Sequence, residues 1–374
     1  ELVDATDGRQ LWGARYDRRL AEILAVEEEI AREISERLKL RLTAEDERRL
    51  TKRHTSDTEA YQAYLRGRYY WNKRTDEWLR RGIREFERAI EIDPRYALAY
   101  AGLADSYTLL YNYYLLPPKE SIPKAKEAAV RALEIDETLA EAHTSLAYAL
   151  WEYDWDWKGA EREYRRAIEL DPTYATAHHW YALFLASAGR FDEAMGEIRR
   201  ARELDPPSLI INANVGMIHY FARRYDEAIA ECRKVIEMDP DFAPARIKLG
   251  WAYHHRGLHR ESVAEFEKVM KLIGDGAGMR GAAAYVRAAA GDREAARKTL
   301  GELVELSERE YVSPYLIATL YAGLGDHDRA FEWLDKALAD RSSWMVYVKV
   351  EPTLDGLRTD PRFADLLRRT GLSP

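Results

Sequence analysis

Apolar residues recur every three to four positions through most of this chain, which is the period of an amphipathic helix. Four of these stretches close with Asp-Pro: Glu85–Pro94 (EFERAIEIDP), Glu163–Pro172 (EYRRAIELDP), Glu197–Pro206 (EIRRARELDP) and Glu231–Pro240 (ECRKVIEMDP). Proline has no N–H and a fixed φ, so each Asp-Pro predicts the end of one helix and a turn into the next. Few stretches alternate with the period of a strand, and the pattern therefore predicts a mainly helical chain.

The spacing of these helix ends is regular. Pro172, Pro206 and Pro240 lie 34 residues apart, which is enough for two helices and their turns. With the proline counted as position thirty-two, small residues fall at positions eight and twenty, where paired helices must approach closely: Ala182, Gly216, Ala194 and Ala228. Position twenty-four is predicted to point inward and is occupied by Phe86, Tyr164, Ile198, Cys232 and Phe266.

On this register the chain resembles the tetratricopeptide repeat family from about Tyr61 to Ala339. The resemblance implies an all-α fold, a right-handed superhelical solenoid of antiparallel helix pairs in which each pair buries its face on the next. We count eight units, and the last two are recognised by the turns Gly291-Asp292 and Gly325-Asp326. The domain prediction places repeats one to six in residues 57–273, repeats seven and eight in residues 279–340, and a capping segment in residues 341–374.

The first 56 residues do not follow the repeat. Leu2–Asp4 and Gln10–Tyr16 predict two strands joined by a turn at Asp7-Gly8, a β-hairpin. A helix is predicted next, from apolar residues spaced by three and four: Leu20, Ile23, Val26, Ile30, Ile34 and Leu38. A hairpin alone is marginally stable, so we interpret residues 1–56 as the hairpin and helix at the tail of a truncated α/β domain.

The two ends of the chain also resemble one protein architecture. LVDATDGRQLWGARYDR near the start, and Trp344–Pro352 (WMVYVKVEP) and Leu357–Leu372 near the end, resemble large bacterial regulators that carry repeats C-terminally. That resemblance implies an upstream winged-helix, adenylate cyclase or serine/threonine kinase domain, without saying which; a freestanding repeat protein is the alternative. In the tail, five apolar side chains are expected to cover the last open face of the solenoid: Leu354, Leu357, Phe363, Leu366 and Leu367.

Composition and charge argue against several classes of function. The net charge of −8 and the pI near 5.8 argue against direct nucleic-acid binding by this segment. Cys232 is the only cysteine, which excludes an internal disulfide and fits a reducing compartment. Since the sequence has neither a signal peptide nor an apolar run long enough for a membrane span, we expect a cytoplasmic location.

No residue pattern points to catalysis, a metal or a cofactor. His254, His255 and His259 are close in sequence, but Gly257 predicts a turn between them, so no shared helical face and no metal site are expected. Gly274–Gly281 (GDGAGMRG) follows a helix and lacks the lysine of a phosphate-binding loop, which favours a connection between repeats. We therefore expect a non-enzymatic protein without a cofactor.

The family resemblance implies that the first helix of each pair lines a concave groove for a partner. Carried onto this chain, the groove residues are His179, Leu183, Ile210, Asn214, Met217, Tyr220, Ile247, Lys248, Trp251 and His254, with Trp180 beside them. This lining is apolar and aromatic and lacks the lysine and asparagine pattern of relatives that clamp a carboxylate. Tyr220 and Trp251 are the expected anchors, because aromatic side chains supply rigid contact area; packing of some of these residues between helices is the alternative.

Two aromatic stretches interrupt the regular array. Leu109–Pro123 is an insertion rich in tyrosine and leucine, and Trp151–Trp157 (WEYDWDW) carries three tryptophans in seven residues. Either the two stretches pack on each other, or they form an exposed patch that binds something.

These observations favour a protein-protein interaction scaffold or sensing module of a bacterial signalling or transcriptional regulator, which binds a peptide or protein in the groove. The alternative is a small-molecule sensor domain that regulates an upstream effector. The sequence does not specify the partner, the signal, the effector or the oligomeric state.

Overall fold

The computed structural model describes residues 2–3, 10–12, 29–30, 33, 54–113 and 115–373. The chain divides into two compact units, residues 1–103 and residues 104–374. The division falls inside helix α5 (Ala97–Asn112). The predicted boundaries at residues 56, 273, 279 and 340 stay predictions.

The first unit contains the opening helix pair, α3 (Thr58–Asn72) and α4 (Asp76–Ile92), and the start of α5. Asp57 caps α3 by accepting hydrogen bonds from the backbone N–H groups of Glu59 and Ala60. The same unit has two short antiparallel strands, β1 (Leu2–Val3) and β2 (Gln10–Trp12), with Leu2 opposite Trp12. The predicted turn at residues 7–8 and most of the predicted helix after residue 17 lie outside the described residues, so the hairpin and the truncated domain stay predictions.

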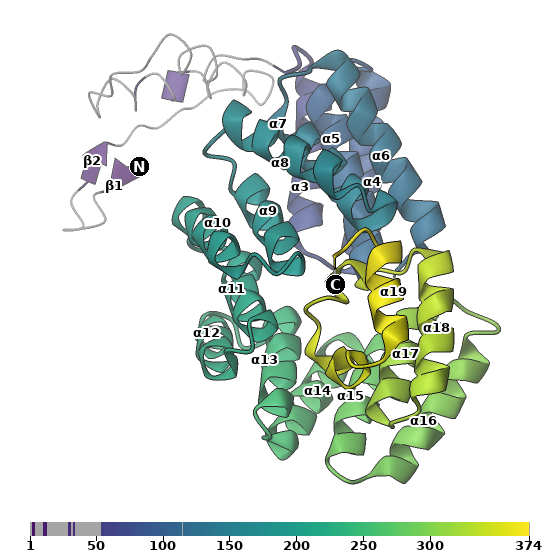
Figure 1. Ribbon diagram of the computed structural model, residues 1–374. Coiled ribbons are helices and arrows are strands. Elements are labelled where there is room, and N and C mark those ends of the chain that lie inside the picture. The colour runs from purple at the N-terminus through teal and green to yellow at the C-terminus, as the bar shows by residue number, and fades with distance from the viewer. Residues whose placement is uncertain are drawn as a thin grey trace. The chain divides into compact units, whose positions relative to one another are not determined.

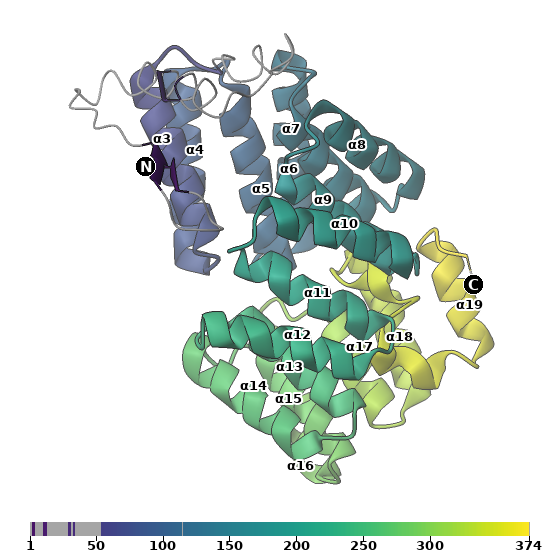
Figure 2. The same ribbon diagram turned by 90° about the vertical axis from the view of Figure 1, so that its left-hand side faces the viewer.

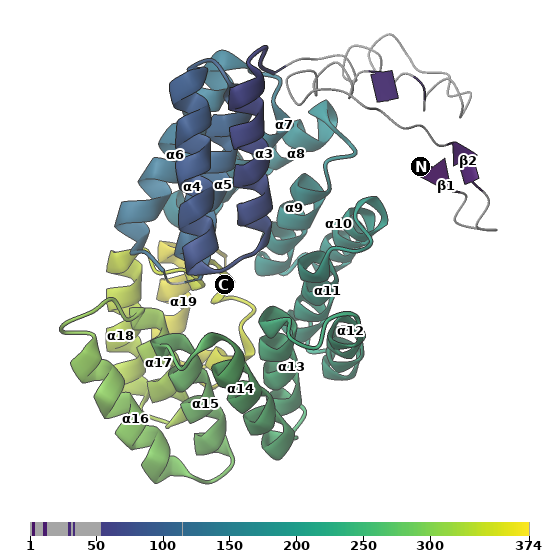
Figure 3. The same ribbon diagram turned by 180° about the vertical axis from the view of Figure 1, so that it is seen from behind.

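The second unit continues as antiparallel helix pairs, which Figures 1 to 3 show stacked in chain order. Its helices are α6 (Pro118–Ile135), α7 (Ala140–Ala149), α8 (Trp157–Leu170), α9 (Ala175–Ser187), α10 (Phe191–Leu204), α11 (Leu209–Phe221), α12 (Tyr225–Met238), α13 (Ala243–His255), α14 (His259–Ile273), α15 (Ala277–Ala289), α16 (Arg293–Leu306), α17 (Pro314–Gly323) and α18 (His327–Asp340). A π-helical turn, η2 (Leu150–Asp154), extends α7. After α18 come two 3₁₀ turns, η3 (Met345–Tyr347) and η4 (Pro352–Leu357), and α19 (Pro361–Arg369).

The Asp-Pro sequences end their helices as predicted. Helices α4, α8, α10 and α12 each stop at the residue before the aspartate, which leaves the helical conformation. The side chains of Asp93, Asp171 and Asp239 then accept the backbone N–H of the residue two positions on, at 2.9 to 3.0 Å. This local hydrogen bond competes with continuation of the helix, and the proline removes the donor that continuation needs.

The predicted contact positions within the repeats are confirmed. All five residues at position twenty-four are fully buried: Phe86, Tyr164, Ile198, Cys232 and Phe266. At position eight, a Cβ on Gly216 would lie 2.7 Å from the sulfur of Cys232 and 3.2 Å from the carbonyl oxygen of Ala228. The paired helices α11 and α12 therefore approach so closely that only glycine fits there.

A pair of glycine substitutions tests this close approach. Gly216→Ala is expected to lower the free energy of unfolding by about 1–3 kcal/mol, because the added methyl group overpacks the contact with Cys232. Gly196→Ala in α10 is the matched control: its Cβ would meet nothing within 4 Å, and helix propensity alone is expected to stabilise the protein by about 0.5–1 kcal/mol. Urea unfolding of both variants measures the difference. A change of the same sign in the free energy of unfolding for both variants would contradict a close contact between Gly216 and Cys232.

The five apolar residues of the tail belong to one core. Leu354, Leu357, Phe363, Leu366 and Leu367 are buried together with residues of α15, α16, α17 and α18. Their prediction as the cover of the last repeats is confirmed. The residues between α18 and α19 reach further than a terminal cap, because Tyr347 contacts η2 and α11.

Candidate functional site

The ten predicted groove residues lie on α9, α11 and α13, the first helices of three successive pairs. Six of them are buried: His179, Leu183, Asn214, Met217, Tyr220 and His254. Four are half-buried: Ile210, Ile247, Lys248 and Trp251. The structure therefore places the predicted set on the first helices of three successive pairs, and it leaves only the second group partly open.

One of the six, Tyr220, is in contact with the segment of residues 341–357, which we call the C-terminal strap. In Figure 1 the yellow C-terminal part lies beside α9, α11, α15 and α17. The ring of Tyr347 stacks on Phe221 of α11, with centroids 5.0 Å apart and planes at 18°. The same ring meets Trp151 of η2 edge-on at 5.6 Å. The strap thus contacts helix pairs that lie far before it in the sequence.

Polar contacts fix the position of the strap on α11. The Tyr220 hydroxyl donates to the Glu351 carboxyl at 2.8 Å, and the Arg223 guanidinium donates to the Val350 carbonyl oxygen and to Asp355 at 2.7 Å. Burial raises the pKa of the Glu351 carboxyl, and the Tyr220 and Thr353 hydrogen bonds oppose that shift. Tyr220, predicted as an anchor for a partner, is therefore an anchor for the chain's own strap.

The apolar content of the strap shows that it is part of the core. Six of its apolar side chains are buried: Met345, Val346, Val348, Val350, Leu354 and Leu357. At about 1.5–3 kcal/mol for each buried aliphatic side chain, their burial contributes roughly 9–18 kcal/mol, an upper estimate because the unfolded chain is partly compact. The cost of ordering the segment opposes this gain. The strap is therefore packed as part of the second unit's core.

The tryptophan-rich stretch provides the surface on which the strap docks. Trp151 is fully buried between Tyr148, Phe184 and Tyr347. The indole N–H of Trp157 donates to the carbonyl oxygen of Thr370 at 2.8 Å. Trp155 has a left-handed backbone, with φ of 58°, and the Arg341 guanidinium lies 3.9 Å from the centre of its ring.

The same stretch packs on the aromatic insertion. The Tyr111 hydroxyl donates to the Glu152 carboxyl at 3.1 Å, and the Asn112 side chain donates to the Tyr148 hydroxyl at 2.8 Å. Glu152 is 3% exposed, and burial raises the pKa of its carboxyl to about 8, which the Tyr111 and Tyr148 hydrogen bonds only partly offset. Of the two alternatives, mutual packing is the one the structure shows.

The half-buried part of the groove carries one cation. Burial lowers the pKa of the Lys248 ammonium to about 8, and the nearby Cys232 thiol acts in the opposite direction. The Cys232 thiol is itself buried, which raises its pKa to about 12 and makes it an inert core side chain.

Asn214 donates to the Nε2 of His179 at 2.6 Å, so these two polar groove residues bind each other.

The three histidines near Gly257 come closer than the turn between them suggested. The ring centre of His254 lies 4.6 Å from that of His255 and 5.1 Å from that of His259. Burial lowers the pKa of His254 to about 4 and that of His255 to about 3, so both imidazoles are neutral at pH 7. Across residues 54–113 and 115–373, no group of three acidic, histidine or cysteine side chains is arranged to hold a metal ion.

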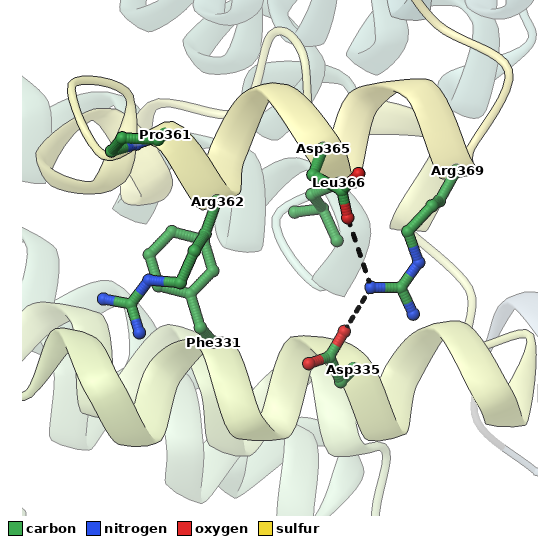
Figure 4. A pocket seen from close by; sticks show the side chains of 7 residues that line it. All are labelled: Phe331, Asp335, Pro361, Arg362, Asp365, Leu366 and Arg369. Carbon is green, nitrogen blue, oxygen red and sulfur yellow. Dashed lines mark hydrogen bonds and ion pairs between the residues drawn. The ribbon is translucent and has the colours of Figure 1, made fainter.

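A pocket of about 350 Å³ lies between α18 and α19 (Figure 4). Its charged side chains already pair with one another: Arg369 contacts Asp335 at 2.5 Å and Asp365 at 3.7 Å. Arg362 pairs with Asp328 and Asp360 and covers the ring of Phe331. With its charges satisfied, this pocket does not favour the small-molecule sensor.

Comparison with known families agrees with this geometry. A tetratricopeptide repeat model matches residues 156–208 and 216–273, and a second one matches residues 315–339. These matches coincide with the helix pairs from α8 to α14 and with α17 and α18. The chain contains tetratricopeptide repeats.

Relatives of the repeats occur in bacterial regulators. The chain is 34% identical over 154 residues to "Putative adenylate cyclase 3" of Rhizobium meliloti, a match that covers 40% of this chain and 26% of that protein. It is 24% identical over 132 residues to the transcriptional regulator HilA of Salmonella typhimurium, covering 35% of this chain and 24% of HilA. The chain thus spans about a quarter of the length of these relatives.

Among solved structures, the human IFIT1 dimer with m7Gppp-AAAA is similar at a TM-score of 0.54 and 17% identity, covering 84% of this chain and 76% of that one. At this identity the likeness shows the fold alone. None of the helices that the structure describes combines the length and the apolar character needed to cross a bilayer.

Sequence reasoning missed the residues that join the tetratricopeptide repeats to the strap. They are Trp151, Phe221, Arg223, Tyr347 and Glu351. One signal was present: Trp344–Val350 is apolar without a helical period, which indicates a buried segment that is not a repeat helix. The sequence does not indicate where such a segment is buried.

Proposed function

We propose that the chain is a non-enzymatic protein-interaction module of a cytoplasmic bacterial regulator and that it holds a peptide or protein segment on the part of its concave face beside the strap. The observation that carries the proposal is the row of half-buried apolar side chains on α11 and α13, Ile210, Ile247 and Trp251, next to Lys248. Tyr220 acts indirectly, by holding the strap.

The regulatory setting is supported by the names of the relatives, an adenylate cyclase and a transcriptional regulator. The chain spans about a quarter of the length of these relatives, and we propose that the effector it controls is a further domain of the same protein. Sequencing the native reading frame upstream of Glu1 tests this setting. A winged-helix, cyclase or kinase domain there would support it, and a start codon within a few dozen residues would leave a freestanding scaffold.

Trp251→Ala is expected to weaken partner capture about tenfold or more, because a half-buried tryptophan on a binding face is a frequent hot spot. The measurement is binding of a partner identified by crosslinking in the native host, titrated by anisotropy against wild type and variant. Trp333→Ala is the matched control: Trp333 is also half-buried but lies on α18. Equal affinity of Trp251→Ala and wild type would contradict binding at the groove. Failure to recover any partner would contradict the function as an interaction module.

A further inference from the structure

The first unit has an exposed aromatic and cationic surface that the groove proposal does not use. It lies where α3 ends and α4 begins, two helices that Figures 2 and 3 show side by side. We call it the α3 patch and define it by six residues: Leu65, Tyr69, Tyr70, Lys73, Arg74 and Trp78. We propose that the α3 patch is a docking surface for an acidic segment of a partner protein that also carries an apolar side chain.

The patch begins with a stripe along one face of α3. Leu65, Tyr69 and Lys73 are spaced by four residues and therefore share a face. Leu65 is 38% exposed and Tyr69 57%. Among the described residues, Tyr69 is the one aromatic side chain that is exposed rather than buried or half-buried.

Three aromatic rings continue the stripe onto α4. Tyr69 meets Tyr70 edge-on at 5.6 Å, and Tyr70 stacks on Trp78 at 5.2 Å with an angle of 24° between the planes. Because these rings support one another, they form a rigid surface that loses little entropy on binding. Tyrosine, tryptophan and arginine are also the residue types that dominate binding hot spots.

Lysine and arginine side chains lie against the aromatic rings of this region. The Lys73 ammonium lies 4.9 Å from the centre of the Tyr69 ring, and the Arg81 guanidinium lies 4.6 Å from that of Trp78. Arg74 lies 4.0 Å from the centre of Trp71, and its backbone has a φ of 58°, which is unfavourable for a residue other than glycine. The local fold thus holds its cations against aromatic rings.

The positive charge of the α3 patch favours a partner with acidic residues. Residues 66–81 contain six cations and two acidic residues, in a chain whose net charge is −8. Arg66, Arg80 and Arg81 pair with Glu85, Asp76 and Glu77. In the part of the chain that the structure describes, Lys73 and Arg74 contact aromatic rings and form no ion pair with a carboxylate. Carboxylates of a partner would complement these two cations.

An acidic peptide fits the patch better than a nucleic acid does. The exposed Leu65 offers an aliphatic contact, which an apolar side chain matches and a sugar-phosphate backbone does not. The negative charge of the whole chain repels a long polyanion. A short segment with a few acidic residues needs only local complementarity, because physiological salt screens charges beyond about 8 Å.

The test uses the full chain and a defined probe. The probe is a fluorescein-labelled peptide in which glutamates flank a central Leu-Phe pair; a peptide of equal length with lysine in place of glutamate and an oligo-dT strand are the comparisons. Binding is followed by fluorescence anisotropy at two salt concentrations. The wild-type chain is expected to bind the glutamate peptide more tightly than either comparison and to lose affinity as salt increases.

Two variants and one control locate the binding. Tyr69→Ala and Lys73→Glu are each expected to weaken binding of the glutamate peptide about tenfold, with unchanged circular dichroism because both side chains are exposed. Arg95→Glu makes the same change of charge at an exposed residue beyond the other end of α4, about 25 Å away, and should stay within about twofold of wild type.

Several results would overturn the proposal. They are no binding of the glutamate peptide, equal binding by both variants and the wild type, tighter binding of oligo-dT, or self-association of the chain that the same variants abolish without any peptide binding. Since the α3 patch and the groove are probed by different variants, either proposal can fail without the other.

Discussion

Replacing Trp151 with alanine is expected to lower the free energy of unfolding by about 3–5 kcal/mol, the range for truncating a fully buried tryptophan. Its indole fills the space between α7, α9 and the strap, where it meets Tyr148, Phe184 and Tyr347. The cavity left by alanine removes the main aromatic contact between η2 and the strap. We therefore expect the strap to loosen before the helix pairs unfold.

Urea unfolding measures the loss of stability, and hydrogen exchange measures the loosening. The amides of Val350 and Glu351 bond to the carbonyl oxygen of Tyr347 at 2.8 and 2.9 Å, so their exchange reports directly on the strap. Trp151→Phe is the control, because the indole N–H has no hydrogen-bond partner among the described residues and a phenyl ring keeps much of the packing. A loss of less than 1 kcal/mol in Trp151→Ala would show that the strap does not depend on this contact.

Glu152→Gln is expected to remove a large pH dependence of stability. Burial raises the pKa of the folded Glu152 carboxyl to about 8, from 4.5 in the unfolded chain. The folded state therefore keeps a proton that the unfolded state releases, and the stability from this group is complete below pH 4.5 and is lost as pH rises through 8. The wild type should lose roughly 3–5 kcal/mol through this residue between pH 5 and 9.

Glutamine has no charge to bury, so the variant should lack this loss. It keeps an amide oxygen for the Tyr111 hydroxyl, and its amide group can donate to Tyr148. Unfolding in urea at pH 5, 7 and 9, taken as the difference between wild type and variant, cancels the other titrating groups. A difference that does not change with pH would contradict a protonated Glu152 at neutral pH.

The strap changes what the repeats can do for a partner. In a simple solenoid, a concave face is open to any segment that fits it. Here Tyr220 and Phe221 hold Tyr347 and Glu351 of the same chain, so the surface that we propose for a partner is limited to the row beside the strap. Substitutions at Tyr220 would act first on the strap, and a lost interaction in such a variant would not place the partner on Tyr220.

The repeat itself could be predicted from the sequence because its determinants are local. Helix ends at Asp-Pro, small residues where paired helices meet and the inward side chains at position twenty-four depend on neighbours within about one repeat. The structure confirms them at Asp93, Asp171, Gly216 and Phe266. The burial of the four tail leucines and Phe363 followed in the same way, from apolar spacing next to the last repeat.

Only the tertiary structure decided which surface the strap packs on. Its hydrogen bonds to α11 join residues 127 to 132 positions apart, and the bond from Trp157 to Thr370 spans 213 positions. The sequence determined that WMVYVKVEP is apolar and not a repeat helix, and that WEYDWDW is aromatic. It did not determine that the two segments pack on each other. Hydrophobic burial is non-directional, so it favours covering each apolar surface without specifying which other segment covers it. The packing of the helix pairs in the second unit decides this, since it places Trp151 and Phe221 against Tyr347.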